Sequence, residues 1–317
     1  MKVIKYYLSI NISHNSSASI MKDGEIIFGA CEERYRKIKN IVCYPKYAIK
    51  DCLNFANIRG KELTKVAFTS YDNDPVLIKS KHSNNFTIKE FWDFYNNKFY
   101  NASLNQKIKY FNWLLKNKRF QDKEDLVNYK FLKVNKEYFK NKKKYLNLYK
   151  NSLIETLSRH IKIDKEKIIF IEHHTCHAYY SYFGSPIRDK NTNIITLDSW
   201  GDGRNQTVWI AKKNKLKLIS QSKENDIGRI YTFATLLLGM RPDEHEFKVM
   251  GMAPYAKKKY LISAYNEIKN ISRVKNMRII EHKRPKDLFN FLINVWKGHR
   301  FDNIAGAVQY FTENLCK

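Results

Sequence analysis

Residues 3–31 read VIKYYLSINISHNSSASIMKDGEIIFGAC, a stretch in which apolar runs alternate with polar breaks. The β-branched and aromatic run at 3–12 predicts a strand, and the polar residues 13–16 predict a loop after it. A second strand is expected at 17–22, and Asp23-Gly24 is a strong signal for a tight turn into a third strand at 25–31. The pattern is therefore strand, polar loop, strand, tight turn, strand.

The same pattern occurs again further along the chain. The run NIITLDS (193–199) predicts a buried strand, WGDGRN (200–205) a loop with two glycines, and QTVWIAK (206–212) a second strand. Lys213 and Asn214 are expected to turn the chain into a third strand at 216–222. Two copies of one unit predict a duplicated pair of α/β lobes facing each other across a cleft. The alternative is a chance match, because three-stranded meanders are common.

Residues 79–170 lie between the two copies and are strongly basic, with 22 Lys and Arg against 9 Asp and Glu. We interpret them as a mainly helical insertion whose charges face solvent. Four segments of the chain have the apolar spacing of helices: 88–95, 146–160, 227–240 (ended by Gly239) and 304–316. The charged segment 241–256 is equally consistent with a site-lining segment and with a simple loop.

The composition limits the class of protein. The 317 residues are 43% hydrophobic and 14% aromatic, which is typical of a folded core, and their formal net charge is +27. Such a surplus can indicate nucleic-acid binding, but a Lys- and Asn-rich composition also follows from a low-GC genome, so we expect no nucleic-acid partner. The five cysteines form no CxxC pair, and neither a signal peptide nor a membrane-spanning run is evident. We therefore expect a cytoplasmic protein that does not bind membranes.

The sequence HHTCH at 173–177 holds three of the nine histidines. If a helix starts here, His173 and His177 lie four residues apart on one face and can converge on one ion. The nearest candidate for a third ligand is Asp198, at the end of a predicted strand. Two imidazoles and a carboxylate with open positions suit Fe(II), Zn or Mn. A hydrogen-bonded polar turn or helix cap is the alternative, and the residues alone leave both open.

Four stretches together resemble the O-carbamoyltransferases that modify nodulation factors and antibiotics such as cephamycins and aminoglycosides: Ile10 to Lys39, HHTCHA (173–178), LDSWGDGR (197–204) and EHEFKVMGMAPYA (244–256). The N-terminal domain of that family is similar to the enzymes that form threonylcarbamoyladenosine in tRNA. The resemblance implies an α/β, duplicated actin-like or sugar-kinase-like (ASKHA) fold with an incomplete second lobe. The expected domains are a first lobe (1–78), the basic insertion (79–170) and the start of a second lobe (171–317).

The resemblance also implies functional residues. A metal ion, commonly iron, would be bound by His173, His177 and Asp198, and His14 would be an active-site residue near the acceptor hydroxyl. Phosphate or substrate contacts are implied for six residues: Lys39, Gly201, Asp202, Gly203, Arg204 and Lys248. The family's fourth metal ligand, an aspartate in a G-D-x-G segment, has no match before Lys317, so we expect further sequence or a second chain to supply it.

The implied reaction is acyl transfer. Carbamoyl phosphate and ATP form a carbamoyl-adenylate, a small-molecule hydroxyl attacks its carbonyl carbon, and AMP leaves. His14 would take the hydroxyl proton as a general base. Two alternatives remain open from the sequence. One is a non-catalytic remnant or a subunit that needs a partner chain, and the other is an RNA-binding protein or an RNA-linked enzyme related to the tRNA-modifying branch.

Overall fold

The computed structural model describes residues 3–71, 87–103, 126–127, 140–188 and 190–317. The chain divides into two compact units. The first consists of Met1–Asn85 and Phe111–Cys176, and the second of Phe86–Tyr110 and His177–Lys317. The described parts of residues 79–170 thus belong to both units, and they do not form the separate domain expected from their charge.

A five-stranded mixed sheet forms the centre of the first unit, in the order β3-β2-β1-β4-β5. Its strands are β1 (Tyr6–Asn11), β2 (Ser17–Lys22), β3 (Glu25–Cys31), β4 (Lys65–Phe68) and β5 (Ile168–Phe170). The first three are antiparallel neighbours, whereas β4 and β5 continue the sheet in parallel on the other side of β1. The expected turn at Asp23 and Gly24 is confirmed by their positive φ angles of 48° and 96°.

The helices of the first unit explain why its boundaries differ from the expected ones. They are α1 (Glu33–Arg36), α2 (Lys46–Ala56), η1 (Gly60–Glu62), α7 (Lys142–Ile161) and η2 (Lys165–Lys167). Leu153 and Leu157 of α7 lie in one core with Ile49 of α2 and with Ile10 and Phe68 of the sheet. Because α7 fills this core and β5 pairs in the sheet, the C-terminal part of the expected insertion is an integral part of the unit.

The second unit contains a three-stranded antiparallel sheet of β6 (Thr192–Gly201), β7 (Arg204–Lys212) and β8 (Lys215–Ser222). Its expected turn is confirmed by the positive φ angles of Lys213 (48°) and Asn214 (60°). Helix α8 (His173–Phe183) packs on this sheet, and its Ala178 and Tyr182 share a small core with Ile194 and Trp209. The sheet and this helix carry the candidate site.

The rest of the second unit is mainly helical. Its elements are α4 (Ile88–Ser103), α9 (Ile227–Leu237), α10 (Glu246–Met252), η3 (Ala253–Tyr255), α11 (Lys258–Ile268), β9 (Ser272–Lys275), β10 (Arg278–Glu281), α12 (Leu288–Val295) and α13 (Phe301–Cys316). Helix α4 joins this group through Trp92, whose ring centroid lies 5.3 Å from that of Phe289. The four expected helices are confirmed, and Gly239 ends one of them with a φ of 74°. Within the described ranges, no helix combines the length and apolar character needed to cross a bilayer.

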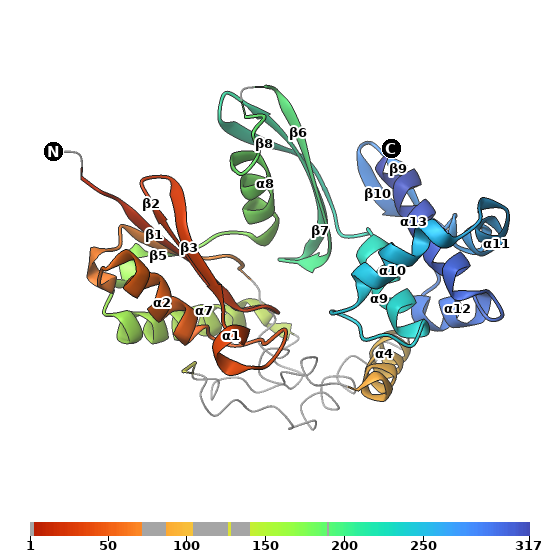
Figure 1. Ribbon diagram of the computed structural model, residues 1–317, viewed down its shortest axis with the longest axis horizontal. Coiled ribbons are helices and arrows are strands. Elements are labelled where there is room, and N and C mark those ends of the chain that lie inside the picture. The colour runs from red at the N-terminus through yellow and green to blue at the C-terminus, as the bar shows by residue number, and fades with distance from the viewer. Residues whose placement is uncertain (1–2, 72–86, 104–125, 128–139, 189) are drawn as a thin grey trace. The chain divides into compact units, whose positions relative to one another are not determined.

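The repeat read from the sequence appears as two antiparallel meanders, β1–β2–β3 and β6–β7–β8 (Figure 1). In each, a two-residue turn with positive φ angles joins the second strand to the third, and the register of that pair shifts once. The two sheets differ beyond the meander, because β1 is extended by β4 and β5, whereas β6 has no further neighbour among the described residues. The chain is thus an α/β protein with a mixed sheet.

Candidate metal centre

Helix α8 begins where the histidine cluster begins. The buried carboxylate of Glu172, just before the helix, accepts hydrogen bonds from the backbone N–H and the hydroxyl of Thr175, at 2.7 and 2.8 Å. The backbone N–H of Cys176 donates to the Glu172 carbonyl at 3.0 Å and closes the first helical turn. A carboxylate that caps the N-terminus also complements the positive end of the helix dipole. This cap fixes His173 at the first helical position.

The structure brings together three of the residues singled out in the sequence. His173 and His177 lie one turn apart on α8, and Asp198 lies on β6. Each offers one ligand atom, and these atoms all lie within 4.8 Å of one another. His177 Nε2 and Asp198 Oδ2 lie 3.7 Å apart. By contrast, His174 is fully buried, in keeping with its place off this helical face.

Asp198 owes its position to an irregular stretch of β6. Regular pairing with β7 holds at Leu197↔Gln206 and resumes at Gly201↔Arg204, so residues 198–200 face a single residue of β7. Such a bulge re-aims side chains that would otherwise alternate across the sheet. The backbone N–H of Ser199 donates to Asp198 Oδ1 at 2.6 Å. This bond orients the carboxylate so that Oδ2 is the oxygen nearest His177.

The donor set fits a divalent cation. Two imidazole nitrogens and one carboxylate oxygen form the 2-His-1-carboxylate arrangement that transition metals such as Fe(II) accept with positions left open. The side chains of His177 and Asp198 are 54% and 34% exposed. Water or a substrate oxygen could therefore reach an ion held by these residues.

Residues 201–204, four of those expected to contact phosphate, form a shorter connection than the sequence indicated. Trp200 and Gly201 end β6 and Arg204 begins β7, so only Asp202 and Gly203 form the connection. Their φ angles of 48° and 85° are those of a tight hairpin turn, in which an Asp-Gly pair is favoured. The expected loop at 200–205 is therefore a two-residue turn directly after the Asp198 bulge. Its role at phosphate stays a prediction.

The other predicted residues lie apart from the three donors along the chain. His14 is exposed in the loop between β1 and β2, where its carbonyl accepts a hydrogen bond from the Asn11 side chain at 3.3 Å. Lys39 is exposed in the turn after α1. Lys248 is exposed on α10, with its Nζ 5.9 Å from the ring centroid of Phe247. Their assigned roles also stay predictions.

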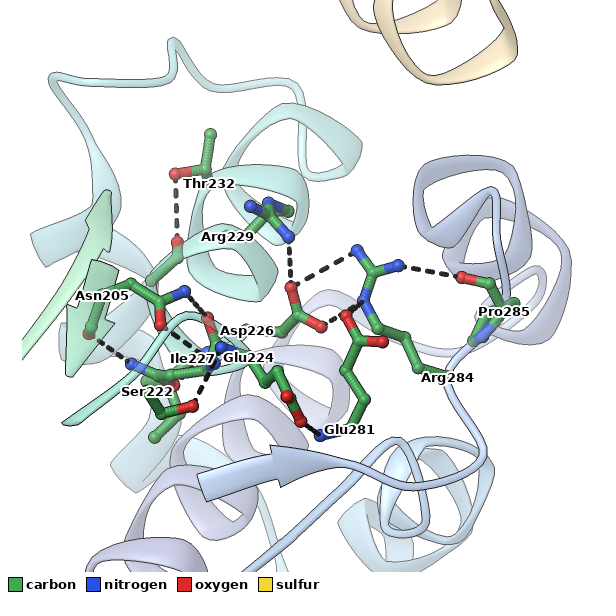
Figure 2. A network of polar contacts seen from close by, with 12 residues as sticks. Asn205, Ser222, Glu224, Asp226, Ile227, Arg229, Thr232, Glu281, Arg284 and Pro285 are labelled. Atoms are coloured by element: carbon green, nitrogen blue, oxygen red, sulfur yellow. Dashed lines mark hydrogen bonds and ion pairs between the residues drawn. The ribbon is translucent and has the colours of Figure 1, made fainter. Parts of the chain in front are cut away.

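Sequence reasoning missed the polar residues that anchor the start of α9. Asn225 lies just before α9 and exchanges hydrogen bonds with Asn205 of β7 (2.5, 3.1 and 3.2 Å). The next residue, Asp226, is 1% exposed and forms ion pairs with Arg229 and Arg284 (Figure 2). The spacing of Asp226 and Arg229 at a predicted helix start was a usable signal. The contribution of Arg284 was not, because it lies 58 residues away.

Comparison with known proteins identifies the group to which the chain belongs. Residues 4–316 match the family model described as carbamoyltransferase N-terminus. The chain belongs to this family. The match covers nearly all of the chain, including both meanders and the three converging donors.

The individual relatives of this chain have low sequence identity to it. Nodulation protein NolNO of Sinorhizobium fredii is 21% identical over 243 residues, covering 76% of this chain and 28% of its own length. Uncharacterized protein sll1178 of Synechocystis is 24% identical over 249 residues (78% and 34%). Uncharacterized protein MJ1058 of Methanocaldococcus jannaschii is 32% identical over 130 residues (36% and 21%). The chain thus spans about a third or less of the curated relatives that it matches.

A solved structure also aligns over 99% of the chain and 78% of its own length, the Acidaminococcus fermentans (R)-2-hydroxyglutaryl-CoA dehydratase component A. The TM-score is 0.41 and the sequence identity is 11%. A likeness of this size does not define a fold.

Proposed function

We propose that this chain is the metal-binding N-terminal part of an enzyme that transfers a carbamoyl group to a hydroxyl of a small molecule. The observation that carries the proposal is the convergence of His173, His177 and Asp198 in a chain that belongs to the carbamoyltransferase N-terminus family. The chain covers a minor part of its relatives' length, so the complete activity is assigned to the whole protein of which these residues form the N-terminal region.

In this proposal the three donors hold one divalent ion, with Fe(II) favoured and Zn or Mn as alternatives. A bound ion of this kind polarises a carbonyl or phosphoryl oxygen as a Lewis acid. His173 and His177 would bind it through their ring nitrogens. Asp198 supplies a negative charge, and the Ser199 amide holds its carboxylate in one orientation.

The remaining steps are assigned to other residues of the chain. The proposed donor is a carbamoyl-adenylate made from carbamoyl phosphate and ATP. His14, exposed after β1, takes the proton of the attacking hydroxyl, and the carbonyl carbon exchanges its bond to the AMP oxygen for a bond to the acceptor oxygen. Backbone N–H groups of Gly201, Asp202 and Gly203 and the guanidinium of Arg204 face the phosphate of the donor. Lys39 and Lys248 add positive charge that favours the binding of anions.

We further propose that the two meanders are the cores of a duplicated actin-like fold. The support is internal, since both meanders share strand order, a two-residue turn before the third strand and one register shift. In the first unit this core is continued by the parallel strands β4 and β5. An experimental structure of the whole protein with parallel strands added beside β6 would support the duplication, and a different neighbour there would contradict it.

The metal centre is tested by elemental analysis of the purified chain after gel filtration. We expect one iron or zinc ion per chain in the wild type, loss of the ion in the His173→Ala/His177→Ala variant, and retention in a matched control, His282→Ala, which removes an exposed imidazole elsewhere. A wild type without metal, or a double variant that keeps it, would contradict the proposed centre.

The reaction is tested with the whole protein. Incubation with radiolabelled carbamoyl phosphate, ATP and a panel of amino sugars and other polyols should give a labelled, acid-stable ester-type product together with AMP. The Asp198→Ala variant should form neither above background. AMP release and product formation that are unchanged in this variant would show that the three donors do not serve carbamoyl transfer.

A further inference from the structure

We propose that Gly228, in the first turn of α9, is a positioning residue for the metal ligand Asp198. It acts by allowing the backbone of α9 to pack directly against Ser199, the residue after the ligand. The inference rests on the proposed metal centre. Gly228 touches neither the ion nor a substrate. It lies 30 positions after Asp198 in the sequence.

The contact at Gly228 leaves little room for a side chain. A Cβ atom at this position would lie 3.0 Å from the backbone nitrogen of Ser199, 3.1 Å from its Cα and 3.2 Å from its Cβ. Ordinary van der Waals contacts of a Cβ begin at 3.4 Å. The φ angle of Gly228 is not among the positive ones, so backbone conformation does not require glycine here. The close approach of Ser199 is the feature that favours glycine here.

Ser199 links the contact at Gly228 to the metal ligand Asp198. Its backbone N–H donates the 2.6 Å hydrogen bond to Asp198 Oδ1. Residues 198–200 lack regular pairing with β7, so the strand ladder does not hold them in place. Helix α9 stabilises the bulge instead, because its first turn packs against the Ser199 amide, which is the group that orients the Asp198 carboxylate.

The start of α9 is itself firmly anchored, so the bulge is the part that has to move. Asn225 is tied to Asn205 of β7 by three hydrogen bonds. Asp226 is buried and paired with Arg229 of the same helix and with Arg284 from the segment before α12 (Figure 2). These contacts connect α9 both to β7 and to the segment after β10. A methyl group added at Gly228 would therefore displace Ser199 rather than the helix.

The predicted consequence is a misplaced ligand in a protein that remains folded. Alanine is favoured over glycine in a helix, so Gly228→Ala does not weaken α9 itself. It shifts the Ser199 amide by a few tenths of an ångström. We expect metal affinity to fall about 10- to 100-fold, the range found when groups that orient metal ligands are altered.

The test is a Co²⁺ titration of the metal-free chain, followed by the d–d absorption bands, which report affinity and coordination geometry together. Two glycine variants serve as controls. Gly251→Ala places a methyl group in open space on α10, and Gly306→Ala places one 2.6 Å from the Ala256 Cβ, a clash in a helix without any of the proposed ligands. Circular dichroism verifies that each variant is folded.

The expected result is weakened Co²⁺ binding with altered d–d bands in Gly228→Ala alone, with Gly251→Ala and Gly306→Ala binding like the wild type. Wild-type affinity and bands in folded Gly228→Ala would overturn the inference while leaving the metal centre intact. A wild type that binds no Co²⁺ would overturn the metal centre and the inference with it. Equal weakening in Gly228→Ala and Gly306→Ala would also overturn the inference, because it would trace the effect to general destabilisation.

A second pair of variants keeps the inference testable if Gly228→Ala does not fold. Ser199 and Asn193 are both exposed residues of β6, but only Ser199 lies in the bulge. Ser199→Gly removes the side chain that meets α9 and frees the backbone, so it should weaken Co²⁺ binding, whereas Asn193→Gly should not. Equal Co²⁺ affinity of these two variants would overturn the inference.

Discussion

The cap of helix α8 offers a direct test of how local structure supports the metal centre. Replacing Glu172 with alanine removes the carboxylate that accepts both bonds from Thr175. The first turn of α8, which carries His173, then loses its cap, whereas His177 lies one turn further in. We therefore expect local fraying at the histidine cluster and weaker metal binding, with the rest of α8 retained by its packing on β6 and β7.

The size of the effect follows from the contacts. Loss of an N-cap side chain costs about 0.5–2 kcal/mol. A hydrogen bond to a charged group contributes about 1.5–3 kcal/mol. Because the two estimates describe overlapping contacts, we expect the opening free energy of the first turn to fall by about 2 kcal/mol, or about 30-fold in the opening equilibrium. Glu172→Gln keeps an acceptor oxygen but loses the charge, so it should give a smaller decrease.

Hydrogen exchange followed by mass spectrometry measures this opening in peptides that cover residues 173–183. The metal-free alanine variant should exchange about 30-fold faster in the first turn than the wild type, with the glutamine variant in between. Exchange in α13 should be unchanged and serves as the internal control. Wild-type exchange rates at residues 173–177 in Glu172→Ala would refute the idea that this carboxylate holds the start of the helix.

Two further predictions concern stability. Burial, reinforced by nearby Lys46, lowers the pKa of His160 below its usual 6.5, so the unfolded chain takes up this proton first as the pH falls. Unfolding free energy should therefore decrease below pH 6.5, less steeply in His160→Gln, as measured by urea unfolding at pH 5.5 and 7.5. Asp226→Asn leaves two guanidinium groups beside a neutral amide and should cost about 3 kcal/mol, measured by the same assay at pH 7.5. If His160→Gln lost as much unfolding free energy between pH 7.5 and pH 5.5 as the wild type, the role assigned to His160 would be wrong. An unchanged urea midpoint in Asp226→Asn would contradict the role assigned to Asp226.

The local elements of this protein are determined by its sequence. Both meanders, the turns at Asp23-Gly24 and Lys213-Asn214 and helix α8 follow from short-range rules, because alternating apolar residues, turn-forming pairs and helix-start signals act within a few residues. The candidate donors were also visible, since two histidines four residues apart share a helical face in any α-helix. The family resemblance drawn from spaced motifs is confirmed by the match over residues 4–316.

Long-range packing decided what the sequence left open. Asp198 lies in a bulge of β6, and the first turn of α9 approaches this bulge at Ser199. No local rule predicts that Gly228 and Ser199 touch, because the contact exists only after the chain has folded. The basic composition of residues 79–170 suggested a separate insertion, yet Leu157 and β5 are built into the first unit. The charge of a segment indicates which of its residues face solvent. Domain boundaries instead depend on which apolar side chains share a core, and only the tertiary structure shows which side chains do so.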